Sequence, residues 1–377
     1  MKIGLLREED DSRVALIPDI TSKLVKEGIT VLVEKKAGEK AFFDDMSYVE
    51  SGAKILTREI ILSEGEIFIS ITPPQPSDLH LFVNKTIISS FQPFDGVYPL
   101  QALVENQINA FSLDMIPRTT LAQAMDVLSS MASVAGYRAV LQAANLLPKY
   151  FPMLTTAAGS IPPAKLLVLG AGVAGLQAIA TAKRLGAVVE AFDTRAAAKE
   201  EVMSLGGKFV EVEGAKDDKA AGGYAVEQSA DYKKKQQELI KAHIIKSDVV
   251  ITTAQLRGKP APTLITKEMV ELMKPGSVIV DLASSTGGNC ALTVDNQTIR
   301  HGDITIYGNS MLSADMPMHA SQLFSKNIYN YLQILVKDKA FYTDFNNEIV
   351  SGSCIAFNGK VLYNNPKEVD LLVTKPE

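Results

Sequence analysis

The sequence predicts an α/β protein with two doubly wound, Rossmann-like domains that are separated by a cleft and joined by long helices. Three observations predict this fold class. Short apolar segments typical of buried parallel strands alternate with helical segments along both halves of the 377-residue chain. One such strand runs directly into a Gly-x-Gly-x-x-Gly turn formed by Gly170, Gly172 and Gly175. Two long helical stretches lie where the halves meet, and a chain of this length can bury two separate cores.

The first domain is expected to contain residues 1–128 together with residues 317–377. Short β-branched runs predict its strands, and apolar residues at helical spacing predict its helices. No glycine fingerprint occurs in this part of the sequence. The expected strands are Lys2–Leu6, Thr30–Val33, Ile67–Ile71, Thr86–Ser90 and Asn109–Leu113, and the expected helices are Asp19–Lys26 and Val97–Asn106.

Two long helices, Thr120–Leu147 and Ala320–Val336, are expected to connect the domains and to leave the cleft between them. Clefts of this kind are where cofactors commonly bind. The last segment, Phe341–Glu377, is expected to return to the first domain, with Val361–Tyr363 as a strand of a terminal hairpin.

The second domain is expected to span residues 129–316 and to contain six strands, the number of a full dinucleotide fold. The first strand begins at Lys165, and the helix after it closes at Gly186, a residue suited to a left-handed cap. The other expected strands are Ala187–Phe192, Lys208–Val212, Asp248–Thr253, Ser277–Leu282 and Asp303–Tyr307, and the expected helices are Leu176–Leu185, Ala196–Leu205, Asp231–Lys246 and Thr266–Met273.

The glycine turn predicts a dinucleotide site, because each glycine has a distinct physical task. Gly170 permits the tight turn, Gly172 lets the backbone approach a pyrophosphate, and Gly175 lets the helix pack closely on its strand. The diphosphate would then bind the free N–H groups and the positive end of the helix dipole. The segment expected to cradle it is Gly170, Ala171, Gly172, Val173, Ala174 and Gly175.

An acidic residue at the end of the next strand indicates which nucleotide binds. Asp193 follows Gly170 by 23 residues, close to the spacing of the acid that bonds the adenosine ribose. A carboxylate here favours NAD, since it accepts hydrogen bonds from bare ribose hydroxyls and repels the 2′-phosphate of NADP. Thr194 and Arg195 follow it, and Arg195 is expected to stack on adenine or to face water.

The later strand ends are expected to contribute further contacts, because ligands of such sheets bind outside the carboxyl ends of the strands. An ordinary loop role is equally compatible with any one of these residues. Those expected to face the cofactor are Thr252, Thr253, Ala254, Asp281, Gly288 and Asn289.

Composition argues against several other classes of function. The formal net charge of −5, without a basic patch bearing interleaved aromatics, argues against nucleic acid as a partner. No signal peptide and no apolar run long enough to span a membrane are found in the sequence, so the cytoplasm is the expected compartment. Cys290 and Cys354 are isolated, and neither a disulfide framework nor a metal site is expected.

Taken with the fingerprint, several motifs resemble the alanine dehydrogenase and nicotinamide nucleotide transhydrogenase superfamily. They are KIGLLRE at residues 2–8, RVALIP at 13–18, PAP at 260–262 and KPG at 274–276. The resemblance is closer to the NAD(H)-binding first domain of proton-translocating transhydrogenase, encoded as a separate alpha subunit. PRTTLAQAMD at residues 117–126, LSS at 128–130 and GGYA at 222–225 carry that closer match.

The resemblance implies a set of roles for particular residues. Arg118, Gln123, Asp126 and Ser129 would hold the nicotinamide end of NADH, and Gln123 would reach toward the second nucleotide. Without the family, the same residues suit a helix start that is capped by Asp126 and paired on the surface by Arg118. Gly223 and Tyr224 would belong to a mobile lid over the cofactor, within the loop of residues 214–230.

The chemistry discriminates between the two branches of the superfamily. Oxidising an amino acid moves a proton as well as a hydride, so it needs a general acid or base and a cation for the carboxylate. The family's amino acid enzymes carry a Lys and a His for these tasks, whereas this chain has ITPPQ at residues 71–75 and SSFQP at 89–93. His80 is the only histidine among the first 128 residues and is interpreted as a loop residue, and Arg13 as structural.

The resemblance therefore implies a Re/Si-specific, proton-translocating NAD(P)+ transhydrogenase subunit. It would pass a hydride between NADH and NADP+ held by a beta subunit that carries the NADP(H) domain. Partner subunits, among them a membrane-spanning alpha-2 type subunit, would keep this cytoplasmic chain peripherally associated with the inner membrane. A homodimer is also implied. Two alternatives stay open: a soluble NAD-dependent alanine or other amino acid dehydrogenase, and a non-catalytic NAD-binding protein.

Overall fold

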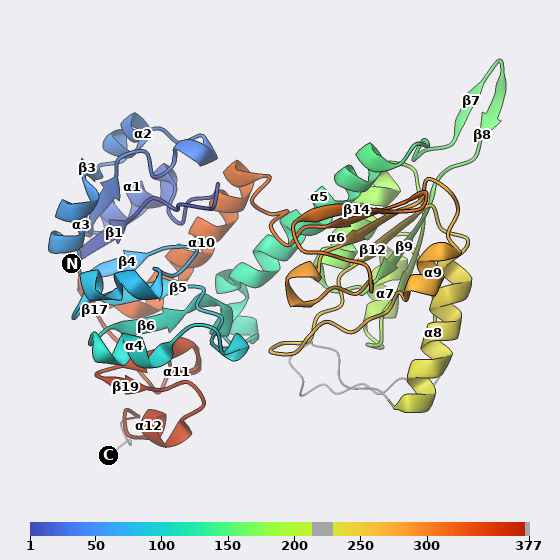
Figure 1. The fold of residues 1–377 in the computed structure, drawn as a ribbon. Coiled ribbons are helices and arrows are strands. Elements are labelled where there is room, and N and C mark those ends of the chain that lie inside the picture. The colour runs from blue at the N-terminus through green and yellow to red at the C-terminus, as the bar shows by residue number, and fades with distance from the viewer. Residues whose placement is uncertain (213–228, 374–377) are drawn as a thin grey trace. The chain divides into compact units, whose positions relative to one another are not determined.

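The computed structural model describes residues 1–212 and 229–373, and it divides the chain into two compact units. Unit 1 consists of Met1–Met131 and Met316–Glu377, and unit 2 of Ala132–Asp315. Each unit is built around its own largely parallel sheet with helices packed against it (Figure 1). The predicted α/β fold class is confirmed.

Unit 1 contains an eight-stranded sheet in the order β19-β18-β6-β5-β4-β1-β2-β3. Its first six strands in sequence are parallel, and β18 and β19 extend the edge at β6 as an antiparallel hairpin. The strands are β1 (Lys2–Leu5), β2 (Thr30–Glu34), β3 (Lys54–Leu56), β4 (Ile67–Ile69), β5 (Thr86–Ser89), β6 (Asn109–Ser112), β18 (Cys354–Phe357) and β19 (Lys360–Val361).

Five expected strands of this sheet are confirmed, the expected hairpin strand at Val361 corresponds in part to β19, and β3 and β18 were missed. The C-terminal segment does return to this sheet, as expected, but its longer strand is β18 rather than the segment at Val361. The short β3 has no alternating apolar pattern that would reveal it. The helices of the unit are α1 (Pro18–Lys26), α2 (Asp45–Glu50), α3 (Arg58–Glu64), α4 (Leu100–Glu105), α10 (Pro317–Leu335), α11 (Glu348–Ser353) and α12 (Pro366–Asp370).

Unit 2 contains a seven-stranded sheet in the order β11-β10-β9-β12-β13-β15-β14. Six strands are parallel, and β14 pairs antiparallel with β15 at one edge. The six expected strands are confirmed as β9 (Lys165–Leu169), β10 (Val188–Phe192), β11 (Lys208–Phe209), β12 (Val249–Thr252), β13 (Val278–Asp281) and β15 (Ile304–Gly308), while the polar β14 (Gln297–His301) was missed.

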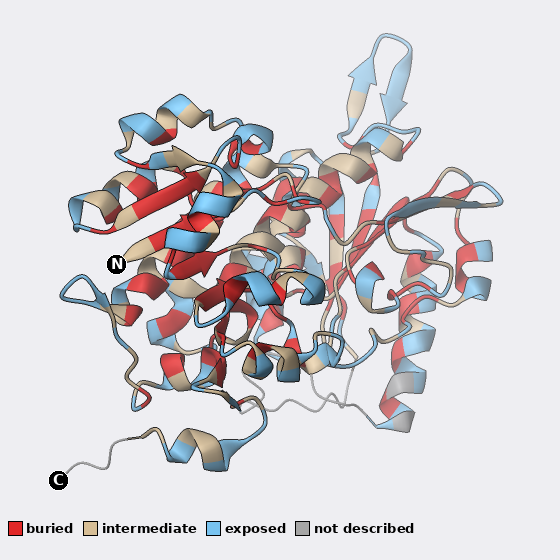
Figure 2. Cartoon of the chain, turned by 60° about the vertical axis from the view of Figure 1, so that its left-hand side comes forward, coloured by how far each residue is buried: buried red, intermediate tan, exposed pale blue. Residues whose placement is uncertain are grey.

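The helices of unit 2 cover a sheet whose central strands are buried along their length, as Figure 2 shows in red. Burial on both faces explains their continuous apolar sequence. The helices are α5 (Val127–Leu146), which begins in unit 1, α6 (Val173–Arg184), α7 (Ala198–Ser204), α8 (Ala230–Ile244) and α9 (Lys267–Glu271). A separate hairpin of β7 (Leu154–Thr156) and β8 (Gly159–Ile161) was not expected.

The long helix expected from Thr120 begins later than predicted. Residues Thr120–Met125 form a 3₁₀ helix, η5, and α5 begins only at Val127. The carboxylate of Asp126 accepts hydrogen bonds from the backbone and hydroxyl of Ser129, which fixes the start of α5 there. The second long helix begins earlier than predicted, because Pro317 takes the first helical position of α10, where a missing N–H is tolerated.

Candidate functional site

The glycine turn between β9 and α6 has the geometry that its sequence predicts. Gly170 has φ +102°, a conformation that favours glycine, and a Cβ there would lie 2.6 Å from the Thr253 hydroxyl. A Cβ on Gly175 would lie 1.9 Å from the carbonyl oxygen of Gly170, so only glycine lets α6 approach β9 this closely. In contrast, no atom of the described residues lies within 4 Å of the Cβ position of Gly172. The turn is therefore packed on its inner side and open at Gly172.

The N-terminus of α6 opens into the same space. Gly172 is its N-cap with extended backbone, and within residues 1–212 and 229–373 no side-chain cap is found at this helix start. Val173 at the first position is 41% exposed. Uncapped N–H groups at the positive end of a helix dipole are a ready site for a phosphate group. These residues fit the pyrophosphate of a dinucleotide.

Asp193 and Arg195 lie beside this turn and form an ion pair. The Asp193 carboxylate accepts from Nε of Arg195 at 3.0 Å and from Nη2 at 3.0 Å. It also accepts from the backbone N–H of Ala171 at 2.7 Å, while Nη2 donates to the Ala171 carbonyl oxygen at 3.0 Å. The side chains are only 8% and 23% exposed, so Arg195 does not face water as one expectation had it. Thr194 between them is half-buried.

A tyrosine that the sequence reasoning missed also lies near this acid. Tyr232 is on α8 and is only 3% exposed. Burial raises the pKa of its hydroxyl, and the negative charge of Asp193 raises that pKa further. Its helix begins after a polar segment without regular apolar spacing, so no pattern in the sequence connects Tyr232 to the glycine turn.

The loop after β12 is hydrogen-bonded to the glycine turn and to the loop after β13. The Thr253 hydroxyl donates to the carbonyl oxygen of Gly170 at 2.8 Å. Asn289 accepts from the backbone N–H of Ala254 at 3.0 Å and donates back to its carbonyl oxygen at 2.8 Å. Thr253 and Ala254 are half-buried, so they remain candidates for contact with a ligand.

Three of the residues expected to face a cofactor are instead wholly buried. Thr252, Asp281 and Asn289 have no exposed surface. Asp281 binds its own loop, accepting from the backbone N–H groups of Ala283, Asn289 and Cys290 and from the Thr293 hydroxyl. Gly288 is buried as well, with φ +80° and its Cβ position 2.7 Å from Asp281. The expectation that these four face a ligand is wrong for this structure, because all four are buried. Asp281 and Asn289 bind groups of the protein, whereas the Thr252 hydroxyl has no hydrogen-bond partner among the described residues.

The remaining residues expected to touch the cofactor, Gly223 and Tyr224, lie outside the described residues.

In unit 1 the structure brings together three of the four residues expected at the nicotinamide end. The Nε of Arg118 lies 3.8 Å from the Asp126 carboxylate, which caps α5 and binds the Ser129 hydroxyl at 2.6 Å. Gln123 is exposed on η5. The segment is tied to α10, where Asn327 and Asn330 both donate to the carbonyl oxygen of Ala124, at 2.8 and 3.0 Å. These two asparagines were missed.

The strand ends of unit 1 hold a buried acidic group that the sequence reasoning also missed. Glu8 follows β1 and is 7% exposed, and its carboxylate accepts from the backbone N–H groups of Ile71 and Thr72 at 2.6 and 3.3 Å. Burial raises the pKa of Glu8 to about 7, although these hydrogen bonds oppose the shift. Arg13 is bound to Asp11, with Nε 2.9 Å from the carboxylate and a side chain only 9% exposed.

Histidine positions in unit 1 differ in part from expectation. His80 lies in the 3₁₀ helix Pro76–Phe82 and is exposed. His319 also belongs to this unit, because it lies in the first turn of α10, where it too is exposed. In the described ranges, no three His, Cys, Asp or Glu side chains are grouped so as to hold a metal ion.

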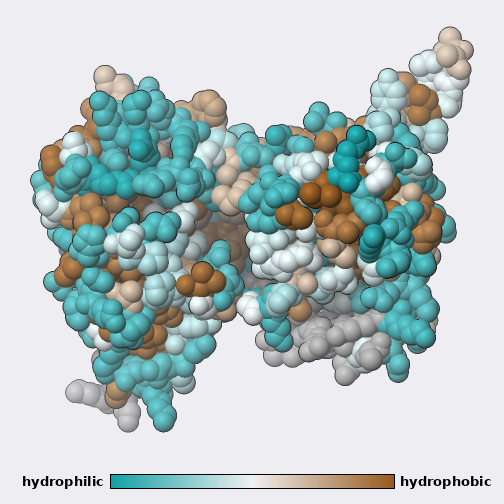
Figure 3. All heavy atoms as spheres, viewed as in Figure 1, coloured by the Kyte–Doolittle hydropathy of each residue, from teal (hydrophilic) through white to brown (hydrophobic). Residues whose placement is uncertain are grey.

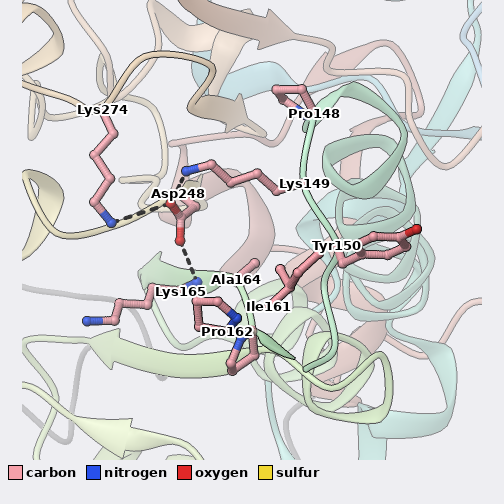
Figure 4. A pocket seen from close by; sticks show the side chains of 10 residues that line it. Pro148, Lys149, Tyr150, Ile161, Pro162, Ala164, Lys165, Asp248 and Lys274 are labelled. Atoms are coloured by element: carbon pink, nitrogen blue, oxygen red, sulfur yellow. Dashed lines mark hydrogen bonds and ion pairs between the residues drawn. The ribbon is translucent and has the colours of Figure 1, made fainter. Parts of the chain in front are cut away.

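Unit 2 has a pocket of about 710 Å³ at the opposite edge of its sheet, where the strands begin. Figure 4 shows Asp248 at its base between Lys149 and Lys274, whose Nζ atoms lie 2.8 and 3.4 Å from the carboxylate. Burial acts to raise the pKa of Asp248, but bonds from Lys149 and from the backbone N–H of Lys165 hold it below its ordinary value. Since such sheets bind nucleotides at their carboxyl ends, this pocket is separate from the glycine turn.

None of the helices within residues 1–212 and 229–373 combines the length and apolar character needed to cross a bilayer.

The chain is similar to known proteins over nearly its whole length. The family model described as alanine dehydrogenase/PNT, N-terminal domain, matches residues 4–135, and its C-terminal counterpart matches residues 139–364. The first part of the NAD(P) transhydrogenase alpha subunit of Rhodospirillum rubrum is 42% identical over 377 residues, covering 96% of this chain and 98% of that protein. The protein of the same name in Rickettsia prowazekii is 41% identical and covers 96% of each chain.

Transhydrogenase is also more similar to this chain than alanine dehydrogenase is when solved structures and more distant relatives are compared. The crystal structure of transhydrogenase from Sinorhizobium meliloti matches with a TM-score of 0.87 and 37% identity, covering 96% of this chain and 100% of that one. Alanine dehydrogenase of Staphylococcus epidermidis is 27% identical, with 97% and 95% of the two chains covered. An L-alanine dehydrogenase structure, at 22% identity and a TM-score of 0.81, shares the fold.

Proposed function

The protein belongs to the alanine dehydrogenase/PNT family, and from this membership we propose that it is the NAD(H)-binding alpha subunit of a Re/Si-specific, proton-translocating transhydrogenase. It passes a hydride between its own NADH and NADP+ held by a beta subunit. The reaction, NADH and NADP+ to NAD+ and NADPH, is balanced by the hydride alone. Proton movement belongs to membrane domains that partner subunits supply. The family membership, and the higher identity to transhydrogenase subunits than to alanine dehydrogenases, agree with the resemblance that the sequence motifs indicate.

One observation favours the transhydrogenase branch over the amino acid dehydrogenases. At the ends of β4 and β5 in unit 1, residues 71–75 and 89–93 contain neither a Lys nor a His, the two residue types that the family's amino acid enzymes carry there. The arginine at this edge, Arg13, is held by Asp11. Amino acid oxidation requires a group that accepts a proton and a cation that receives the carboxylate. Hydride exchange between two nicotinamide rings requires neither.

Binding is assigned to unit 2 and alignment of the reacting ring to unit 1. The open turn at Gly172 and the start of α6 would hold the pyrophosphate, and Asp193 the adenosine ribose. Arg118, Gln123, Asp126 and Ser129 would hold the nicotinamide end, with Gly223 and Tyr224 in a loop that covers it. NAD(H) supplies the hydride chemistry when bound. The protein's contribution is positioning, since reacting atoms must come within roughly 3–3.5 Å of each other.

The further partners follow from the same proposal. They are the beta subunit with its NADP(H) domain and a membrane-spanning alpha-2 type subunit, which would keep this cytoplasmic chain at the inner membrane. The relatives' name, which designates one portion of a divided alpha subunit, supports the existence of other subunits.

A homodimer also belongs to the proposal, and the β7–β8 hairpin supports it. The two strands pair only with each other in the described parts of the chain, and none of their residues is buried. The hairpin projects from unit 2 and carries no charged residue, as its pale and brown surface in Figure 3 shows. An isolated two-stranded hairpin is marginally stable in water, which favours its being covered by a second copy.

Sedimentation analysis of a variant with residues 154–161 replaced by a short Gly-Ser turn tests the homodimer. We expect the variant to sediment as a monomer while NADH binding persists. Dimers of unchanged strength would remove the hairpin from the interface.

The main experiment measures hydride transfer from NADH to an analogue of NADP+. The chain is assayed alone and then with the NADP-binding beta subunit or its soluble domain. Transfer only in the mixture supports the proposal, whereas reduction of NAD+ by alanine without a partner supports an amino acid dehydrogenase. NADH binding without transfer in either assay supports a non-catalytic binding protein.

The exposed Gln123 allows the assigned roles to be separated. Gln123→Asn shortens the side chain by one methylene and should reduce hydride transfer at least tenfold while NADH affinity changes less than twofold. Equal losses in both measurements would make Gln123 a simple binding residue.

A further inference from the structure

We infer that Asp193 excludes NADP from this site by holding an arginine that would otherwise bind the 2′-phosphate, so that Arg195 is a masked phosphate ligand. This inference rests on the proposed function, because it assumes that the turn at Gly170 binds the adenosine half of a dinucleotide. It goes further by naming the pair of residues that decides which nucleotide is accepted.

Each carboxylate oxygen of Asp193 accepts two hydrogen bonds from the protein. Oδ1 accepts from the backbone N–H of Arg195 at 2.8 Å and from its Nε at 3.0 Å. Oδ2 accepts from the backbone N–H of Ala171 at 2.7 Å and from Nη2 of Arg195 at 3.0 Å. The carboxylate thus makes a two-pronged pair with the guanidinium, the geometry that an arginine also offers to a phosphate.

The arginine has an anchor besides the carboxylate. Its Nη2 donates to the carbonyl oxygen of Ala171, in the middle of the glycine turn, at 3.0 Å. Neutralising Asp193 therefore removes one partner of the guanidinium and leaves this one. The cation would stay beside the place where the ribose is expected.

Asp193 and Arg195 are the two residue types by which dinucleotide folds recognise NAD and NADP at the end of the second strand. In dinucleotide folds an acid here bonds the 2′-hydroxyl of NAD, and an arginine nearby accommodates the 2′-phosphate of NADP. This chain carries both, two residues apart and bound to each other. A phosphate approaching the wild-type pair would meet a carboxylate whose side chain is only 8% exposed and therefore poorly screened by water. Discrimination between NAD and NADP thus depends on Asp193 occupying the guanidinium group of Arg195.

Binding of two fragments to the full chain tests the inference without any chemistry at the nicotinamide. The probes are 5′-AMP and 2′,5′-ADP, which differ only by the 2′-phosphate, and calorimetry gives both affinities. We expect wild type to prefer 5′-AMP, and Asp193→Asn to bind 2′,5′-ADP at least tenfold more tightly than wild type does. The double variant Asp193→Asn, Arg195→Ala should lose that gain. Glu200→Gln, an exposed acid on α7, is the matched control and should leave both affinities unchanged.

Three other outcomes would contradict the masking of Arg195 or the proposed function. An equal gain in the double variant would mean that Asp193 acts by repulsion alone and that Arg195 is not a ligand. Retained 5′-AMP binding with no gain for 2′,5′-ADP would reject the masking. If wild type binds neither probe, the proposed function itself fails. Because Asn could weaken the bond to Ala171, Asp193→Ser, which keeps an acceptor oxygen, is measured in parallel and should show the same gain.

Discussion

The carboxyl ends of the two sheets differ in how their backbone N–H groups are satisfied. In unit 2 the first turn of α6 has no side-chain cap, and the space at Gly172 is open. In unit 1 the protein fills the equivalent edge with its own acids and hydroxyls. Glu8 binds the N–H groups of Ile71 and Thr72, and Ser112 binds that of Phe91.

This difference teaches that the doubly wound architecture does not by itself make a nucleotide site. Both sheets place strand ends and loops at one edge, and α1 and α4 of unit 1 also start without a side-chain cap. Among the described residues, the turn at Gly172 in unit 2 is distinguished by combining the glycine fingerprint, an uncapped helix start and open space. Filling the donors internally stabilises an edge without a ligand, because a buried N–H without a partner is costly. Leaving them open at the surface lets water satisfy them until a phosphate binds.

A substitution in the glycine turn of unit 2 is expected to have the largest effect on stability and on NADH binding. Gly175→Ala would place a methyl group 1.9 Å from the Gly170 carbonyl oxygen, which neither backbone can avoid. We expect a loss of at least about 3 kcal/mol in the free energy of unfolding, with loss of NADH binding, measured by chemical denaturation and fluorescence titration.

Gly172→Ala is the matched control for this variant. Its φ of −74° suits alanine, and its Cβ position has no neighbour within 4 Å in the part of the chain that the structure describes. The fold should keep its stability, while NADH affinity falls at least tenfold because the methyl group occupies the open space. A stable Gly175→Ala protein, or full NADH affinity in Gly172→Ala, would contradict the assigned roles.

Glu8 provides the next largest effect and concerns unit 1. Its pKa in the folded protein is about 7 against an ordinary value of 4.5, so between these values the folded state binds more protons than the unfolded state. The free energy of unfolding therefore falls as pH rises through this window, by about 3 kcal/mol in total, and is level above it. Glu8→Gln cannot titrate and should lack this fall.

Urea unfolding of wild type and Glu8→Gln across the window, followed by circular dichroism, measures the difference between them. Glu39→Gln is the control, since the Glu39 side chain is 63% exposed. The same pH dependence in wild type and Glu8→Gln would show that the buried carboxylate does not carry the expected shift.

Sequence reasoning identified much of the fold and of the glycine turn because those signals are local. Alternation of apolar runs gave the parallel strands, and the spacing of Gly170, Gly172 and Gly175 gave the turn. It failed at Asp281 and Asn289, because whether a polar residue at a strand end faces a ligand or its own loop depends on how that loop folds back. It also missed Asn327 and Asn330, whose partner Ala124 lies far away in the sequence.

Asp126 gives the smallest effect on stability and tests whether its cap is its whole function. The structure shows it capping α5 through Ser129, as the purely structural interpretation expects, while Arg118 lies within 3.8 Å. Asp126→Ala should lower the free energy of unfolding by about 1 kcal/mol, and Asp126→Ser, which can still cap, should restore most of it. If the carboxylate also aligns the nicotinamide end, hydride transfer with the beta subunit stays low in both variants. If Asp126→Ser recovers transfer together with stability, the carboxylate serves only to start the helix, and unit 1 positions the ring through Arg118 and Gln123.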